Sequence, residues 1–156
     1  MSEKPKVQTR HISPKSAAAN YTAPSLHTVV SKLILDDEAF LPVYNAKETA
    51  VVLKVNIPWN HSDPKNMNQR PPLQLPHRST VLVNCGFSME IPAGYRAVIS
   101  PTSAMAARGL MVVPTIFEDK VEVYVTNVGR EIVVLNHGDA FAELAIEPVY
   151  QIKWER

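Results

Sequence analysis

The sequence predicts an all-β fold, and three observations lead to this prediction. Short runs rich in β-branched and aromatic residues recur at intervals of about 8 to 12 residues, with turn residues between them, as in antiparallel sandwiches and barrels. Only residues 103–108 are rich in helix formers, and so short a stretch does not form a stable isolated helix. The chain has 156 residues, 46% hydrophobic and 20% charged, which suits one domain with one core.

The strands are expected, in chain order, at residues 28–35, 49–57, 79–84, 88–91, 95–100, 109–113, 120–127, 131–135 and 140–150. The clearest turns between them are residues 91–94 and 127–129. Pro92 presets φ in the first turn, and glycine accepts a positive φ in both. Residues 103–108 are expected to form a single helical turn.

The first 26 residues differ from the body that follows. They contain four basic residues against one acid, Glu3, together with three prolines and almost no apolar periodicity. This composition predicts a flexible N-terminal arm at residues 1–26, followed by a single β domain at residues 27–156. Two roles stay open for the arm. It is either a solvated tail or a segment that crosses to a neighbouring subunit or contacts a phosphate.

A long loop is expected at residues 57–75, which are crowded with Pro, Asn, Asp and Gln and lack the period-two alternation of a strand. In compact domains, loops longer than about 12 to 15 residues are more often functional or disordered than simple connectors. Trp59, His61, Lys65 and Arg70 are therefore candidates for a ligand lid or a partner contact.

Charge and composition exclude several classes of protein. The net charge is +1, from 16 basic and 15 acidic residues, so no overall field attracts nucleic acid or lipid. The apolar runs are far shorter than the ~20 residues that a membrane-spanning helix needs. The lone Cys85 forms no internal disulfide and no signal sequence begins the chain, so a cytoplasmic, reducing location is expected. The five histidines lack metal-binding spacing, so neither a metal site nor a cofactor is expected.

Three segments between residues 40 and 149 follow a familiar order. The first is Phe-Leu-Pro-Val-Tyr at 40–44 with Thr-Ala at 49–50, the second is the strand, turn, strand, turn rhythm of 75–95, and the third is Gly-Asp-Ala-Phe-Ala-Glu-Leu at 138–144. Together they resemble the trimeric dUTPase family, which also includes the dCTP deaminases. The resemblance implies a dUTPase-like distorted β-barrel, jelly-roll-like, in a β-prism homotrimer. It also implies nucleotide clefts between subunits and an exchanged last strand.

The residues that carry the family's reaction differ in this chain. The family places a carboxylate beside the nucleotide's metal and phosphates in an Ala-Gly-x-Asp-Leu motif. Here the matching residues, 50–54, are Ala-Val-Val-Leu-Lys, with Leu53 where the Asp belongs. Leucine cannot hold Mg²⁺, which demands oxygen ligands.

The family's second carboxylate follows an Ile in the hairpin around the uracil. In this chain Ile116 is followed by Phe117, and Glu118 and Asp119 come only afterwards. The segment from residue 102 to 127 is also several residues shorter than the resemblance implies. We therefore expect that this hairpin does not read the base.

The phosphate motif is altered as well. The family's Pro-Arg-Ser-Gly corresponds to Pro-Thr-Ser-Ala at 101–104, so Thr102 replaces the forked, permanently charged arginine. Ser103 and nearby backbone N–H groups are candidates to hold an anion, and Arg108 is placed to compensate in part. The alternative is that Thr102 and Ser103 simply cap the helical turn.

Loss of reactive residues on a retained scaffold favours a non-catalytic trimer of this fold that binds a nucleotide, a nucleotide-derived signal or a protein partner. The residues expected to bind the ligand are Thr102, Ser103, Ala104, Arg108, Thr115, Ile116, Phe117 and Lys120. One alternative is a divergent, active dUTP-like diphosphatase that uses Mg²⁺ and has Glu118 or Asp119 as its water-orienting carboxylate. A second alternative is a structural or assembly trimer.

Overall fold

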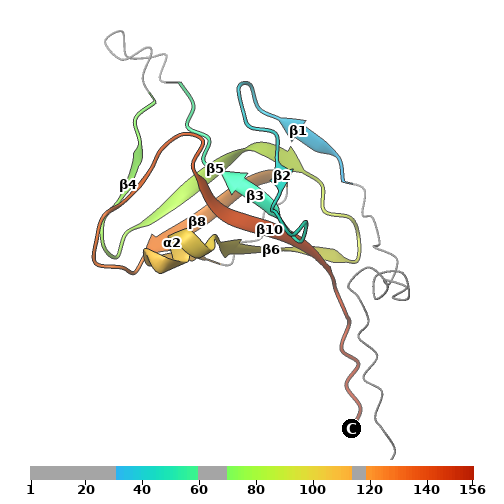
Figure 1. Ribbon diagram of the computed structural model, residues 1–156. Helices are drawn as coiled ribbons and strands as arrows, with labels where there is room; N and C mark the ends of the chain where they lie inside the picture. The colour runs from blue at the N-terminus through green and yellow to red at the C-terminus, as the bar shows by residue number, and fades with distance from the viewer. Residues whose placement is uncertain (1–30, 60–69, 114–118) are drawn as a thin grey trace, which may run out of the picture.

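The protein was analysed as a computed structural model, which describes residues 31–59, 70–113 and 119–156. Its elements, in chain order, are β1 (Leu33–Leu35), β2 (Val43–Tyr44), β3 (Val51–Lys54), β4 (Leu73–Leu75), β5 (Thr80–Met89), β6 (Tyr95–Pro101), α2 (Ser103–Ala107), β7 (Leu110–Val112), β8 (Lys120–Asn127), β9 (Val133–Leu135) and β10 (Ala140–Pro148). The predicted all-β fold class is therefore confirmed (Figure 1).

Four strands form an antiparallel sheet in the order β1-β5-β8-β7. Its longest pairing joins β5 to β8, with Thr80 opposite Thr126. The register of this pair shifts between Asn84 and Ser88, where Gly86 has a φ of 78°. Glycine accepts this positive φ, which allows β5 to bulge without ending. The two strands predicted at residues 79–84 and 88–91 are thus one continuous strand.

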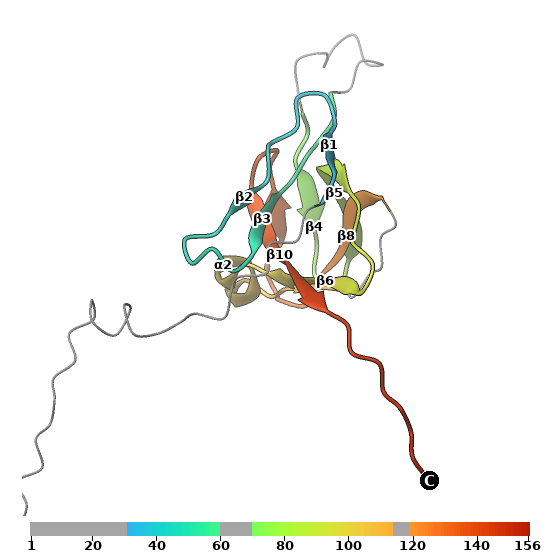
Figure 2. The same cartoon turned by 90° about the vertical axis from the view of Figure 1, so that its right-hand side faces the viewer.

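A second antiparallel sheet has the order β2-β3-β10-β6, and β4 and β9 form a small two-stranded sheet. Leu53 of β3 lies opposite Ala142 of β10, which in turn lies opposite Pro101 of β6. In Figure 2 the strands β2, β3 and β10 lie on one side of the body and β5 and β8 on the other. Beyond β10, the Val149 N–H still donates to the Gly94 carbonyl (2.8 Å), and residues 150–156 leave the body as an exposed, extended segment.

The core between the sheets is built by alternation along the strands. On β8, Val121, Val123 and Val125 are completely buried, whereas Glu122 and Tyr124 between them are not. Successive side chains of a strand point to opposite faces, so this pattern buries one face of β8. Full burial of a Val or Leu side chain contributes about 1.5–3 kcal/mol relative to exposure. Other completely buried core residues are Leu53, Val55, Leu75, Val83, Leu135 and Phe141.

The turn after α2 and the turn after β8 are in close contact. Gly109 has a φ of 89°, and a Cβ added to it would lie 2.5 Å from the backbone N of Gly129. The buried side chain of Asn127 holds the second turn, because its Nδ2 donates to the carbonyls of Leu75 (2.7 Å) and Glu131 (2.8 Å). Its Oδ1 accepts from the Gly129 N–H (2.9 Å), so this buried amide is fully paired.

The structure also departs from the predicted elements at β2, β4 and the end of α2. β2, which pairs with β3, was not predicted. β4 lies inside the predicted loop at residues 57–75. Its three residues are too few to be recognised as a strand from the sequence alone, and they form one by pairing with β9. The helical turn at Ser103 is confirmed, although α2 ends at Ala107. Residues 1–26 lie outside the described residues. In the described part of the chain, no helix has the length and apolarity to span a membrane.

Candidate functional site

The candidate ligand residues fall into two groups at opposite ends of β8. Ser103 and Arg108 lie at α2, which leads into β7, and Leu110 of β7 pairs with Asn127 at the end of β8. Lys120 begins β8 at its other end. A strand of this length spans roughly 23 Å at about 3.3 Å per residue. One chain therefore does not bring Lys120 to Arg108. The candidates Thr115, Ile116, Phe117 and Glu118 lie outside the described residues.

At α2, Thr102 is the N-cap residue: it has extended backbone angles, and its hydroxyl accepts a hydrogen bond from the Met105 N–H (3.3 Å). The alternative that Thr102 caps the turn is thus confirmed. Ser103 and Ala104 follow on the exposed side of the helix, and Met105 is buried beneath them. The hydroxyl of Ser103 is therefore accessible from solvent.

Arg108 ends α2 and lines a pocket of about 400 Å³. Its Nη1 lies 3.9 Å from the sulfur of Met105. Arg130 and Glu131 line the same pocket from the turn after β8, and Gly109 and Gly129 also belong to its lining. Two guanidinium groups at one pocket provide donors for an anion.

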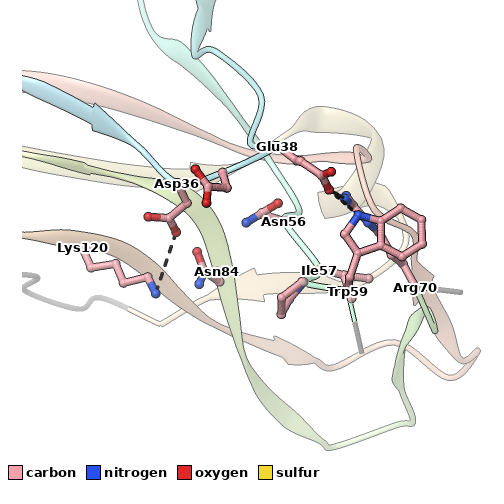
Figure 3. Close-up of a pocket in the computed structure, with 10 residues that line it drawn as sticks. Asp36, Glu38, Asn56, Ile57, Trp59, Arg70, Asn84 and Lys120 are labelled. Atoms are coloured by element: carbon pink, nitrogen blue, oxygen red, sulfur yellow. Dashed lines mark hydrogen bonds and ion pairs between the residues drawn. The ribbon is translucent and has the colours of Figure 1, made fainter. Parts of the chain in front are cut away.

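Lys120 lines a different pocket of about 480 Å³, between the segment after β1, the segment after β3, and β5 (Figure 3). Its Nζ lies 3.9 Å from carboxylate oxygens of both Asp36 and Glu122. These groups are partly exposed, so each pair contributes little to stability. Asp119 is also exposed, and its carbonyl accepts a hydrogen bond from the Met89 N–H (2.8 Å).

Glu38, Trp59 and Arg70 line this second pocket, and Arg70 also contacts His137, which is not part of the lining. The Arg70 guanidinium lies 4.3 Å from the ring centre of Trp59 and pairs with the carboxylate of Glu38, to which the Trp59 indole also donates. Only 12% of the Arg70 side chain is exposed. Trp59 and Arg70 were candidates from the sequence, whereas Glu38 and His137 were not.

The surroundings of His137 disfavour its protonated form. The Ile57 N–H donates to its Nδ1 (3.0 Å), and the Arg70 guanidinium, which carries only donors, lies against its Nε2. Burial, and then the positive charge of Arg70, lower the pKa of His137 below 6.5, and Glu38 offsets part of this effect. The ring therefore supports the chain after β3 as an acceptor and is not placed to act as a cation near neutral pH.

Leu53, at the position where the resembling motif has an aspartate, is completely buried. It lies on the inner face of β3, opposite Ala142, which is also completely buried. The two neighbouring residues of β3, Val52 and Lys54, are both partly exposed. The side chain at position 53 therefore belongs to the core and does not reach a surface cleft.

The family model and the curated proteins that resemble this chain are all described as dUTPases. The family model described as dUTPase matches residues 68–156. A protein of Desulfotalea psychrophila named deoxyuridine 5'-triphosphate nucleotidohydrolase is 41% identical over 81 residues, which are 47% of this chain and 54% of that protein. A protein of the same name from Maricaulis maris is 28% identical over 123 residues, 74% of each chain. The chain spans 54% and 59% of the lengths of the first two curated relatives.

Solved structures share the fold at low sequence identity. The native EIAV dUTPase matches with a TM-score of 0.60 at 17% identity, over 81% of this chain and 97% of that one. A dUTPase of Staphylococcus bacteriophage 80alpha matches with a TM-score of 0.64 at 11% identity, over 83% and 96%. The description of the phage protein states that phage dUTPases control the transfer of virulence genes by a G protein-like mechanism.

Proposed function

Because this chain belongs to the dUTPase family, we propose that it binds a nucleotide or a nucleotide-derived signal in clefts between the subunits of a homotrimer and does not hydrolyse it. The observation that carries this proposal is the complete burial of Leu53. A carboxylate can bind a nucleotide's metal ion only if it lies at a surface cleft. Position 53 lies in the core instead, and its leucine has no oxygen atom with which to bind the ion.

The binding half of the proposal rests on polar groups near α2. Thr102 is occupied as the N-cap, whereas the Ser103 hydroxyl is exposed. Arg108 and Arg130 line one pocket a few residues away and offer forked donors to phosphate oxygens. We therefore expect Ser103, Arg108 and Arg130 to form an anion site, although the arginine of the family motif is missing.

The family resemblance also implies Mg²⁺, and the described residues do not fit a protein-held ion. No group of three His, Cys, Asp or Glu side chains in this part of the chain is arranged to hold a metal. Position 53, where the motif provides a carboxylate, is apolar and buried. We therefore assign no step to a metal.

The trimer is supported by the exposed apolar residues and by the divided site. Tyr150, Ile152 and Trp154 alternate along the extended segment after β10, and all three are largely exposed in one chain. An apolar strand of this kind is expected to pair with a second copy. A cleft that uses both Ser103 and Lys120 also requires two subunits, because one chain holds these residues at opposite ends of β8.

A second candidate function is a divergent, active dUTP diphosphatase, and the curated relatives favour this candidate over the first. They are named as deoxyuridine 5'-triphosphate nucleotidohydrolases, and the protein of Desulfotalea psychrophila is 41% identical over 81 residues. The described residue available to orient water is the exposed Asp119. In that case Asp119→Asn would abolish pyrophosphate release in the presence of Mg²⁺.

Isothermal titration of the full chain with dUTP, dUMP and a panel of cyclic nucleotides tests the binding proposal. We expect saturable binding to at least one of them, and we expect the double variant Ser103→Ala, Arg108→Ala to lower its affinity at least tenfold. Sedimentation should give three times the chain mass of 17.3 kDa. A monomer at micromolar concentration, or no binding to any nucleotide, would contradict the proposal.

A further inference from the structure

Charge is divided unevenly between the first 30 residues and the rest of the chain. Residues 1–30 contain four basic residues and one acidic residue, a net charge of +3. Residues 31–156 contain 12 basic and 14 acidic residues, a net charge of −2. A basic segment at one end of a chain is often an interaction tail. The acidic surfaces of the body are therefore candidate partners for it.

An acidic surface follows β1 directly, at the pocket of about 480 Å³. Asp36, Asp37 and Glu38 are consecutive, and all three line the pocket. The Lys120 Nζ lies 3.9 Å from Asp36 and 3.9 Å from Glu122, so one lysine is shared by two carboxylates. Asp37 is exposed and has no ion-pair partner among the residues that the structure describes. The pocket thus has a carboxylate that its own cations leave unpaired.

Arg70, the other cation of the pocket, is committed to other groups. Its guanidinium lies over the ring of Trp59 and contacts both the Glu38 carboxylate and His137. Its remaining nitrogen, Nε, is buried and has no hydrogen-bond partner in the described part of the chain. These three neighbours set the position of Arg70, and it supplies no donor to Asp37.

The turn that carries the three carboxylates is held in place. The Asp36 N–H donates to the Gly86 carbonyl (2.8 Å), and the Ala39 N–H donates to the Asp36 carbonyl (3.2 Å). Glu38 has a φ of 60°, which is costly for a residue other than glycine and persists only where the surroundings enforce it. The carboxylates are therefore positioned before any partner binds.

Two asparagines lie beside these carboxylates. The Asn56 N–H donates to the Asn84 carbonyl (2.8 Å), which places the two residues side by side. In Figure 3 both amides lie between Asp36 on one side and Ile57 on the other. Amide groups offer donors and acceptors to a peptide backbone, and an unpaired carboxylate favours a basic side chain. The chemistry of the pocket thus fits a basic peptide segment.

The first 30 residues join the body close to this pocket. The Ser31 hydroxyl donates to the Glu90 carbonyl (2.6 Å), which fixes the point where they join. From there β1 (Leu33–Leu35) spans roughly 10 Å and leads directly to Asp36. Lys15 lies far enough before Ser31 to reach up to roughly 50 Å. A tethered segment meets its site at an effective concentration of about millimolar, so weak ion pairs suffice.

We propose that the N-terminal segment docks on the pocket of its own chain, with Arg10 or Lys15 on the carboxylate of Asp37. Closing the loop back from Ser31 costs less entropy for these two residues than for Lys4, which lies further along the chain. The docking surface is distinct from the anion site at α2. The inference therefore goes beyond the function proposed above and does not depend on it.

Paramagnetic broadening in the full chain tests this docking. Cys85 is the only cysteine of the sequence and is buried, so Ser13→Cys provides a selective site for a nitroxide label. In a Trp154→Phe background, the indole N–H signal of Trp59 in a ¹⁵N spectrum reports on the pocket that this residue lines. We expect this signal to be broadened at low salt and to recover at about 1 M salt, where the screening length is about 3 Å.

A pocket variant and its control test the role of Asp37. Loss of one partly exposed ion pair predicts that Asp37→Asn lowers the docking equilibrium constant roughly twofold to fivefold. Glu48→Gln is the matched control, because it removes an exposed carboxylate that neither lines the pocket nor has an ion-pair partner in the described part of the chain. Broadening in this control should equal that of the unmodified pocket.

Two arm variants with the same change of charge test the assignment within the N-terminal segment. Arg10→Gln combined with Lys15→Gln should reduce broadening more than Asp37→Asn does. Lys4→Gln combined with Lys6→Gln should reduce it less. An equal effect of the two double variants would reject the assignment to Arg10 and Lys15.

Mixed samples show which chain supplies the segment. Chains that carry both ¹⁵N and the label, refolded with a large excess of plain chains, report docking within one chain. Chains with ¹⁵N alone, refolded with a large excess of labelled chains, report docking between chains. We expect broadening mainly in the first sample. No broadening at low salt, equal broadening with Asp37→Asn, or broadening only in the second sample would each overturn the proposal.

Discussion

Replacement of Gly109 by alanine should destabilise the protein much more than the same change at Gly94, although both residues have a positive φ. Gly94 has a φ of 82° and an added Cβ would meet nothing within 4 Å. Gly94→Ala therefore introduces backbone strain alone, roughly 1–2 kcal/mol. At Gly109, with a φ of 89°, the new Cβ would also lie 2.5 Å from the Gly129 N and 2.6 Å from its Cα.

The contact at Gly109 is with backbone, which cannot rotate away as a side chain can. Overpacking of this kind costs about 1–3 kcal/mol, so together with the backbone strain we expect Gly109→Ala to lose about 2–5 kcal/mol in total. Gly129→Ala separates the two causes. Its φ is not positive, yet its Cβ would lie 2.5 Å from the Arg108 carbonyl oxygen, so it should show the contact cost without the strain.

Urea unfolding followed by circular dichroism, at one fixed protein concentration, measures these differences. With an m-value of about 2 kcal/mol/M, the midpoint of Gly109→Ala should lie roughly 1 M below that of Gly94→Ala. Fixed concentration matters because association stabilises the folded chain. Equal midpoints for the two variants would refute the close contact between the α2 turn and the turn after β8, and with it the placement of Arg108 beside Arg130.

Three further outcomes are expected. Burial, and to a smaller extent the nearby charge of Glu122, raises the pKa of the Cys85 thiol to about 12. Thiol labelling at pH 8 should therefore be about 1,000-fold slower in native protein than in urea. Equal labelling rates would show that β5 is open. The lowered pKa of His137 means that the folded state binds the proton of this histidine more weakly than the unfolded state does. The resulting contribution to stability is complete above about pH 6.5 and is lost as the pH falls through the folded pKa. If the His137 signal titrates at or above about pH 6.5 by NMR, this prediction is contradicted. Leu53→Ala should cost about 2–5 kcal/mol of unfolding free energy, whereas the exposed Leu41→Ala should cost little, and similar melting temperatures for both variants would show that Leu53 is not in the core.

The strands with the clearest alternation could be predicted from the sequence. β8 was predicted at residues 120–127 and is found there, because three buried valines alternate with polar or exposed residues. β4 could not be predicted, since Leu73–Leu75 follows two prolines and becomes a strand only by pairing with β9. The bulge at Gly86 was also missed, because a glycine within a β-rich run resembles a break between two strands.

The candidate site could be predicted only in part. The position of Thr102 before a short helical turn allowed capping to be named as an alternative, because capping depends on neighbouring residues alone, and the structure confirms it for Thr102. The pairing of Asn56 with Asn84 depends on a contact between separate strands, and no local spacing reveals it. The same limit applies to the contact of His137 with Arg70. The sequence offered one signal, a polar residue in the apolar run around Asn56, which is unusual for a buried strand end.

The most direct measurement is of pyrophosphate release from dUTP by the purified full chain with Mg²⁺, under conditions in which calorimetry has shown the nucleotide to be bound. With Leu53 in the core and Thr102 occupied as a cap, we predict binding and no release above the level without protein. Release that the chain carries out and that Asp119→Asn abolishes would contradict a non-catalytic role and would establish this member of the dUTPase family as an active diphosphatase.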